Sequence, residues 1–144
     1  MATKTLRQSA LDFLARREHS RFELSKKLTS REFPADDITF LLDKLEQENL
    51  LSDERFTEAY VNWRSRRGYG PERIKRELLE RGVASQLINQ YIALLSDQWL
   101  ELAAEVRNKK FGIELPRDFS TKAKQMSFLQ YRGFTLDQIN AVIP

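Results

Sequence analysis

The chain has 144 residues, of which 41% are hydrophobic and 31% charged, and its formal net charge of +3 is small; this balance indicates a folded, strongly helical protein rather than a disordered one. The absence of cysteine and the single His19 exclude a disulfide framework, a thiolate metal site and a histidine metal cluster. The sequence contains neither 18 consecutive apolar residues nor a signal peptide, so we expect a cytoplasmic protein with no membrane segment and no cofactor.

The first third of the chain is expected to form three short helices. Ser20 followed by Glu23 makes a capping box, in which each side chain accepts a backbone N–H of the other residue, and this pair begins the second helix. Pro34 permits a break and a new helix start. The apolar positions of the first and third helices recur at three-to-four spacing, at Leu6, Ala10, Phe13, Leu14, Ile38, Leu41, Leu42 and Leu45.

The middle third repeats this plan. Ser52 is the expected N-cap of its first helix. A glycine–proline turn follows at residues 68–71, and Pro71 suits a first helical turn because its φ is fixed. Gly82 is expected to end that helix with a positive φ, and Ser85 is expected to cap the next helix.

The last third is less regular. Gly133 repeats the helix stop, and Thr135 with Gln138 makes a further capping box. The only linker-like stretch is residues 113–120, which includes Pro116. No segment alternates apolar and polar residues over more than a few positions, so we expect no β-strand.

Residues 6–45 and 56–95 are two copies of one pattern, related by an offset of 50 without a gap. A third, degraded copy is related to the second by an offset of 43 and then 51, which corresponds to an eight-residue insertion at residues 113–120. Such a period is typical of repeat proteins, which usually serve as binding surfaces, and units this small should depend on their neighbours. We therefore predict an all-α, elongated array of three tandem three-helix, helix-turn-helix-like repeats, nine helices in all, over residues 1–51, 52–96 and 97–144.

Positive charge is concentrated in the middle repeat. Residues 1–50 carry nine basic and nine acidic residues, whereas residues 64–81 carry seven basic and three acidic ones, a net charge of +4. The middle repeat is therefore where a phosphate or an acidic partner would be attracted. Arginine suits phosphate and carboxylate, and an aromatic ring beside it can stack on a base or pack on a partner. The candidate binding residues are Arg64, Arg66, Arg67, Tyr69, Arg73, Lys75 and Arg76.

Alternatively, these arginines could serve only to stabilise the folded protein. Arg73 could pair with Glu77, and Arg76 with Glu80, four residues on along a solvated helix face. This explanation is weaker for the arginines at 64–67, because few acidic residues on their own helix are close enough to form ion pairs with them. The glycine–proline turn is explained by helix capping alone.

Catalytic arrangements are absent from the sequence, so we expect no enzyme. His19 lies in a helix-capping segment without an obvious acid partner and is expected to be capping or exposed. Asp36 and Asp37 fall in a first helical turn, where they complement the helix dipole. Trp63 and Trp99 lie on the inward periodic face and are predicted to be core residues.

A long motif lies between residues 53 and 83, with the glycine–proline turn at its centre. Its residues are Asp53, Arg55, Phe56, Tyr60, Arg64, Gly68, Tyr69, Gly70, Pro71, Arg73, Ile74, Glu77, Leu78, Gly82 and Val83. Together with flanking matches at residues 20–28 and 129–134, this motif resembles the bacterial RecX family over essentially the whole chain.

The resemblance implies tandem three-helix repeats and a regulator that binds the RecA recombinase and the RecA–DNA filament, lodges in the helical groove and inhibits strand exchange and ATP hydrolysis. It implies a place in DNA recombination, DNA repair and the SOS response, and the family also has weak DNA affinity. We expect a monomer whose basic middle repeat faces the groove wall or the DNA. The alternative is a stand-alone helix-turn-helix DNA-binding protein, which salt-dependent, sequence-preferring binding to naked duplex would favour.

Overall fold

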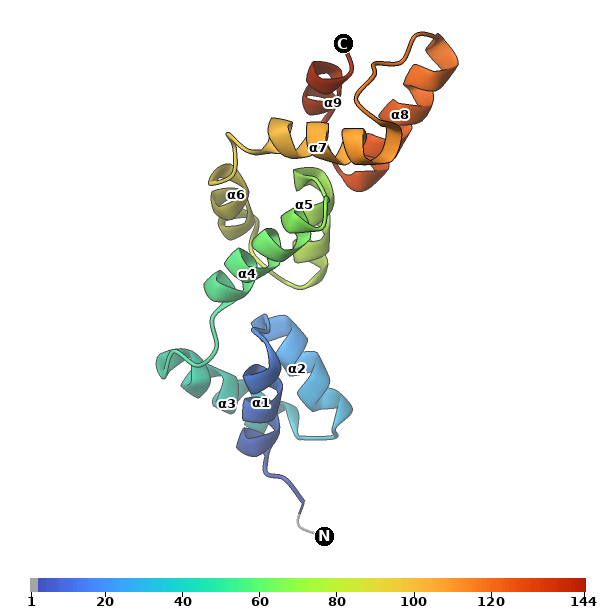
Figure 1. Cartoon of the computed structure of the whole chain (residues 1–144). Coiled ribbons are helices and arrows are strands. Elements are labelled where there is room, and N and C mark those ends of the chain that lie inside the picture. Colours follow the sequence, from blue (N-terminus) through green and yellow to red (C-terminus); the bar gives the residue numbers. More distant parts are fainter. Residues whose placement is uncertain (1–2) are drawn as a thin grey trace.

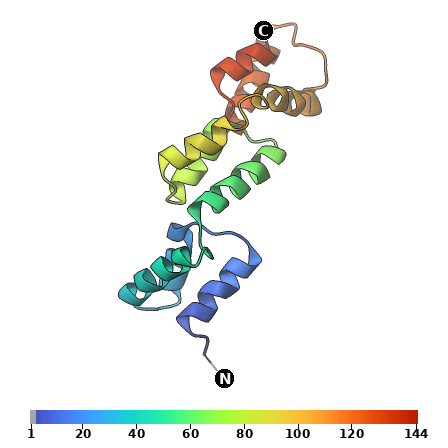
Figure 2. The ribbon, with the colours of Figure 1, turned by 90° about the vertical axis from the view of Figure 1, so that its left-hand side faces the viewer.

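The computed structural model describes residues 3–144, which form nine α-helices and no strand, and this confirms the predicted all-α fold. In chain order the helices are α1 (Leu6–Arg16), α2 (Arg21–Ser30), α3 (Ala35–Gln47), α4 (Asp53–Arg66), α5 (Pro71–Glu80), α6 (Ser85–Ala93), α7 (Trp99–Phe111), α8 (Phe119–Arg132) and α9 (Leu136–Val142). They form a long, narrow stack with the two termini at opposite ends (Figure 1), and Figure 2 shows the same elongation from the side. Among residues 3–144, no helix combines the length and the apolar character needed to cross a membrane.

Local capping chemistry sets most of the helix starts. Ser20, Ser52 and Thr135 each accept the backbone N–H three residues further on, as expected from the sequence. The prediction for Ser85 is wrong, because the N-cap is Ala84 and Ser85 is the first helical residue of α6. Helix α6 begins without a side-chain cap. Helix α3 also begins without one, after Pro34, which lies 50 positions before Ala84.

Backbone hydrogen bonds between two turns hold the middle and last repeats together. The Gly70 N–H donates to the Arg132 carbonyl at 2.8 Å, and the Glu72 N–H donates to the Gly133 carbonyl at 2.8 Å. A Cβ atom on Gly70 would lie 2.5 Å from the carbonyl carbon of Gly133, so this approach of two backbones requires glycine. Gly133 and Gly82 adopt φ values of 101° and 76°, as expected for glycines that end helices.

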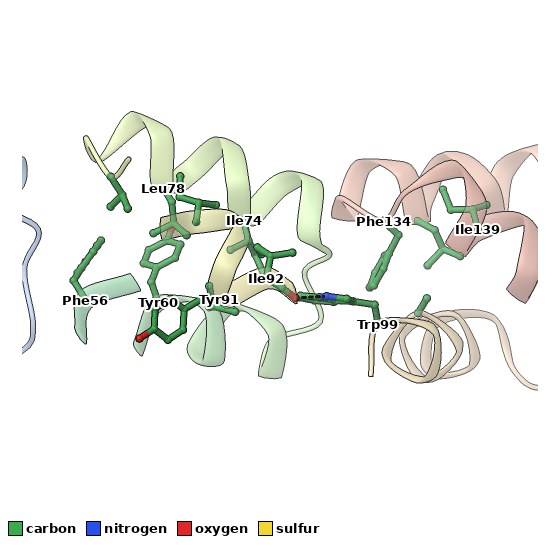
Figure 3. Packing of buried hydrophobic residues seen from close by; sticks show 14 of the residues in the cluster. Phe56, Tyr60, Ile74, Leu78, Tyr91, Ile92, Trp99, Phe134 and Ile139 are labelled. Atoms are coloured by element: carbon green, nitrogen blue, oxygen red, sulfur yellow. Dashed lines mark hydrogen bonds between the residues drawn. The ribbon is translucent and has the colours of Figure 1, made fainter. Parts of the chain in front are cut away.

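The structure has two separate hydrophobic cores. The core of α1–α3 consists of Ala10, Leu24, Leu28, Ile38, Leu41, Leu42, Leu45 and Leu51. The other core runs without interruption through α4–α9 (Figure 3). Trp99 links its two halves: the side chain is buried, as predicted, and the indole N–H donates to the Ile92 carbonyl at 3.1 Å. The middle and last repeats therefore form one packed body, while the first repeat has a core of its own.

Polar groups cross the contact between the first and middle repeats. Three such contacts are Ser20 Oγ donating to the Arg81 carbonyl at 2.7 Å, the Arg21 N–H donating to Asp53 Oδ1 at 2.7 Å, and Arg55 Nε donating to Glu18 Oε1 at 2.9 Å. The ring of Phe22 also packs over Gly82. These contacts position the first repeat without joining the two cores.

The prediction that Trp63 belongs to the core is wrong. Its side chain is 48% exposed, because the inward face of α4 is occupied by Phe56, Tyr60 and Val61. Trp63 lies at the edge of that face, where its ring meets the ring of Tyr60 edge-on with centroids 5.5 Å apart. Helical periodicity places a residue on the apolar side of a helix, but it does not say how far the neighbouring repeat covers that side.

His19 is buried, not exposed, in the segment between α1 and α2. Its Nδ1 lies 3.1 Å from the Arg17 carbonyl, and its Nε2 lies 2.8 Å from Lys27 Nζ. Since an ammonium group can only donate, Nε2 accepts and Nδ1 carries the proton of a neutral ring. His19 therefore closes the corner between two helices by hydrogen bonding at both of its nitrogens.

Candidate partner-binding surface

The structure divides the predicted binding residues into two groups. Arg64 on α4 makes a bidentate ion pair with Glu77 on α5, at 2.9 Å and 2.8 Å, and this pair is largely shielded from solvent. Arg73 Nε and the Tyr60 hydroxyl donate to the same carboxylate, at 3.2 Å and 2.9 Å. The sequence concealed the partner of Arg64 because the acid lies on the next helix, 13 residues away.

The electrostatics of this network follow from its burial. Burial alone would raise the pKa of Glu77, but hydrogen bonds from Arg64, Tyr60 and Arg73 outweigh it, and the pKa lies below its usual range. Burial and the hydrogen bond to Glu77 raise the pKa of Tyr60 to about 12. The carboxylate therefore stays charged and holds both guanidinium groups against the protein.

Tyr69 is also engaged within the protein. Its ring centroid lies 3.8 Å from the guanidinium carbon of Arg64, 4.5 Å from that of Arg73 and 4.9 Å from that of Arg132. These distances are typical of cation–π contacts. Arg64, Tyr69 and Arg73 thus join α4, α5 and α8, and we assign them a structural role.

The remaining predicted residues face solvent to different degrees. Lys75 lies 3.6 Å from Glu72 in a loose pair, and Arg76 is exposed. Arg66 and Arg67 at the end of α4 are both exposed, and they make no ion pair within residues 3–144. Of the original set, Arg66, Arg67 and Arg76 are therefore exposed and without an ion pair among the described residues, and Arg66 and Arg67 are adjacent at the end of one helix.

Arg66 and Arg67 line a cleft of about 430 Å³ between α4, α7 and α8. We call this site the basic cleft; its charged residues are Arg66, Arg67, Lys109, Lys110, Arg132 and the single acid Glu105. None of the five cations forms an ion pair with another residue of the described chain. The three helices all end at this cleft, and basic residues at helix ends also complement the helix dipole. Five cations around one opening with one acid nevertheless give this cleft a positive potential.

Lys109, Lys110 and Arg132 were not among the residues predicted from the sequence. The repeat did contain a signal for one of them, because the offset of 43 places Lys110 at the position of Arg67. The sequence could not show that the ends of α4, α7 and α8 meet, because that proximity comes from the packing of the last repeat against the middle one. The carbonyl of Arg67 accepts a hydrogen bond from Arg132 Nη1 at 3.2 Å across this contact.

A second, more apolar cleft lies where the first and middle repeats meet. It has a volume of about 330 Å³, and its walls include Phe56, Tyr60 and the exposed Trp63. Its polar lining is balanced, since Arg17 pairs with Glu23 at 3.1 Å. The charge of this cleft therefore selects no class of partner.

Comparison with known proteins identifies the three repeats in turn. The family models for the first, second and third three-helix domains of RecX match residues 7–45, 52–92 and 96–143. The regulatory protein RecX of Pseudomonas syringae pv. tomato is 43% identical over 138 residues, which are 96% of this chain and 89% of that protein. The regulatory protein RecX of Ectopseudomonas mendocina is also 43% identical over 138 residues, which are 96% of this chain and 92% of that protein.

Solved structures show the same fold. The crystal structure of RecX from Lactobacillus salivarius has a TM-score of 0.80 at 23% identity and covers 94% of this chain and 90% of that chain. A second crystal structure, of a regulatory protein RecX, has a TM-score of 0.84 at 20% identity and covers 95% of this chain and 70% of that chain. The matches to all three domain models, with the closely related full-length sequences, establish that this chain belongs to the RecX family.

Proposed function

We propose that this chain is a regulatory protein that binds RecA and the RecA–DNA filament and inhibits recombinase activity and ATP hydrolysis. The observation that supports this proposal most directly is the match of all three repeats to RecX domain models, with relatives named regulatory protein RecX at 43% identity. The chain would act as a monomer, without a cofactor or chemistry of its own, in the cytoplasm where its partner works.

The basic cleft is the surface that we assign to the filament. Its unpaired cations suit either an acidic wall of the filament groove or the phosphates of the DNA inside it. Arg66 and Arg67 form one side of the cleft, and Lys109 and Lys110 form another. Since the cleft joins two repeats of one packed body, a bound partner meets helix ends that are held in fixed relative positions.

The elongated array suggests how binding would inhibit. A stack of repeats lying along the groove contacts successive RecA protomers and restricts the rearrangements that hydrolysis and strand exchange require (Figure 1). Weak affinity for DNA alone would follow from the same cations. The regulatory effect would then come from contacts with the protein and the DNA together.

RecA-catalysed ATP hydrolysis on single-stranded DNA, titrated with this protein, tests the proposal. We expect hydrolysis to fall at substoichiometric to stoichiometric ratios, and strand exchange to fall with it. Unchanged rates in the presence of excess protein would contradict the proposal. Unchanged rates combined with salt-dependent, sequence-preferring binding to naked duplex would instead favour a stand-alone helix-turn-helix DNA-binding protein.

A further inference from the structure

Trp63 places an exposed aromatic ring directly beside the basic cleft. Its side chain is 48% exposed. Arg67 follows one helical turn later at the end of α4, and its guanidinium carbon is 5.6 Å from the indole centroid. Arg67 also lines the basic cleft, together with its neighbour Arg66. We call Trp63, Arg66 and Arg67 the α4 edge; it joins an aromatic surface to the cations of the cleft.

The indole is held from the protein side. The ring of Tyr60 meets it edge-on, with centroids 5.5 Å apart, and the guanidinium carbon of Arg64 lies 5.3 Å from its centroid. Arg64 is in turn fixed by two hydrogen bonds to Glu77 and lies 3.8 Å from the ring centroid of Tyr69. A ligand that packs on Trp63 would therefore meet a ring whose position is set by its neighbours.

The charges on the two sides of Trp63 differ. The chain has no acid from residue 59 to residue 71. Glu105 in the basic cleft and Glu101 in the adjoining cleft of about 470 Å³, which Arg66 also lines, are the acids on the side of the arginines. With five cations against these two acids, that side keeps a net charge of +3. The cleft on the other side of Trp63 is neutral, since its charged residues are Arg17, Arg81, Glu18 and Glu23. An anionic ligand at Trp63 would therefore extend toward the basic cleft.

The basic cleft contains a second ring among its cations. Phe128 is one of its lining residues. Lys110 Nζ lies 5.7 Å from the centroid of this ring, and the guanidinium carbon of Arg132 lies 5.3 Å from it. Aromatic and basic side chains thus alternate from the α4 edge into the cleft.

This alternation points to single-stranded nucleic acid. Each nucleotide carries one phosphate, which suits an arginine, and one flat base, which stacks on an aromatic ring. In a duplex the bases are stacked on one another, and a base must leave the stack before a side chain can cover its face. An acidic protein surface would pair with the arginines alone, whereas a single strand uses the cations and the rings together.

We propose that the α4 edge binds single-stranded DNA, with one base stacked on Trp63, the adjacent phosphates on Arg66 and Arg67, and the strand continuing into the basic cleft. This inference rests on the proposed function, because that function places the protein on a filament that contains single-stranded DNA. It assigns the basic cleft to the DNA of the filament rather than to an acidic wall of RecA.

Tryptophan fluorescence during titration with oligothymidylate tests the stacking directly. Trp99→Phe leaves Trp63 as the single indole of the chain, and its emission should be quenched by the single strand and far less by a duplex of the same length. If Trp99→Phe does not fold, the wild type serves instead, because Trp99 is only 4% exposed and the quenching should then disappear in Trp63→Phe.

Trp63→Leu should lower the affinity for oligothymidylate by about fivefold or more, because it removes a stacked base. Trp63→Phe should retain part of the affinity. The loss in Trp63→Leu should persist as salt is raised, whereas the loss from reversing the charge of Arg66 and Arg67 should shrink. The matched control is Phe40→Leu on α3, since Phe40 is 69% exposed and has Lys44 Nζ 5.8 Å from its ring centroid. This variant should bind like the wild type.

The possible outcomes separate this inference from the proposed function. Absence of oligothymidylate binding at low salt, wild-type affinity in Trp63→Leu, or equal quenching by single strand and duplex would overturn the stacking site; inhibition of RecA by the wild-type protein would still support the proposed function. A loss of filament affinity in Trp63→Leu without a loss for free oligothymidylate would assign the α4 edge to the RecA protein and overturn the inference. Trp63-dependent binding of the single strand by a protein that does not inhibit RecA would support the site and contradict the proposed function.

Discussion

The two tryptophans of this chain lie in different environments, although each occupies an apolar position on its helix. Trp99 is buried in the shared core of the middle and last repeats and donates a hydrogen bond to a backbone carbonyl. Trp63 is half exposed; its ring meets Tyr60 edge-on, and the guanidinium carbons of Arg64 and Arg67 lie 5.3 Å and 5.6 Å from its centroid. Their contributions to stability should therefore differ widely.

We predict that Trp99→Ala raises the free energy of the folded state by about 3–5 kcal/mol, the usual cost of removing a buried tryptophan. Trp63→Ala should cost only about 1–2 kcal/mol, because it removes partial burial, an edge-on aromatic contact and two cation–π contacts. Urea denaturation of both variants measures the difference. An equal loss of stability in the two variants would mean that Trp63 is buried in solution.

His19 makes the first repeat sensitive to acid. Burial is the main reason why its pKa lies below the usual value, and the nearby positive charges of Arg17 and Lys27 add to the effect. The unfolded chain thus binds the proton more readily than the folded one, so the contribution of His19 to stability is present above about pH 6.5 and is lost as the pH falls below it.

We predict that the free energy of unfolding of the first repeat decreases as the pH is lowered from about 7 to 5, before most carboxylates titrate. His19→Gln, which cannot titrate, should remove this dependence. Denaturation midpoints measured over that pH range check the prediction. The same slope in the variant would show that another group is responsible.

At the scale of elements, the interlocked turns 68–71 and 132–134 hold the middle and last repeats at a fixed angle. Gly70 has a negative φ, so its Cβ would be unstrained in the backbone but would collide with the chain at Gly133 and Phe134. Replacing Gly70 should therefore act through crowding alone.

We predict that Gly70→Ala destabilises the packed body by about 1–3 kcal/mol, as overpacking usually does. Gly112→Ala is the comparison, because its Cβ meets nothing within 4 Å and only its positive φ of 84° opposes the change. Thermal unfolding of both variants separates crowding from backbone strain. A Gly70→Ala protein with the melting temperature of the wild type would show that the two turns do not make contact.

The helices, the caps at Ser20, Ser52 and Thr135, and the glycine stops could be predicted because each depends on residues a few positions apart. Contacts between side chains on different helices could not be predicted in this way. Glu77 reaches Arg64 from another element, and the basic cleft joins residues from two repeats. Local periodicity therefore gave the architecture, while the candidate site depended on how the repeats pack.

At the scale of the whole molecule, the two cores divide the chain into a first repeat and a body of six helices. The contact between them includes hydrogen bonds and ion pairs, such as Arg55 with Glu18, rather than a shared apolar core. The partly exposed ion pair contributes little stability, and each of the two hydrogen bonds contributes about 1 kcal/mol net. The two parts should therefore be able to open separately.

We predict that the first repeat unfolds before the body of α4–α9. Hydrogen exchange should show lower protection for buried amides of α1–α3 than for those of α4–α9, and raised salt should widen the gap by screening the ion pairs at the contact. A single cooperative transition with equal protection in both parts would show that the chain behaves as one unit.

The central claim is that the basic cleft binds the RecA–DNA filament, and the affinity of charge-reversed variants measured at low and high salt tests it most directly. We predict that Arg66→Glu with Arg67→Glu lowers the melting temperature only slightly, through the lost positive charge at the end of α4 and the lost contact of Arg67 with Trp63, and lowers filament affinity by about tenfold or more at low salt. This loss should shrink as salt rises. Arg16→Glu with Lys26→Glu, which alters two exposed cations of the first repeat, should change affinity far less. Equal losses from the two pairs, or no loss from the cleft pair while the wild type binds, would contradict the account.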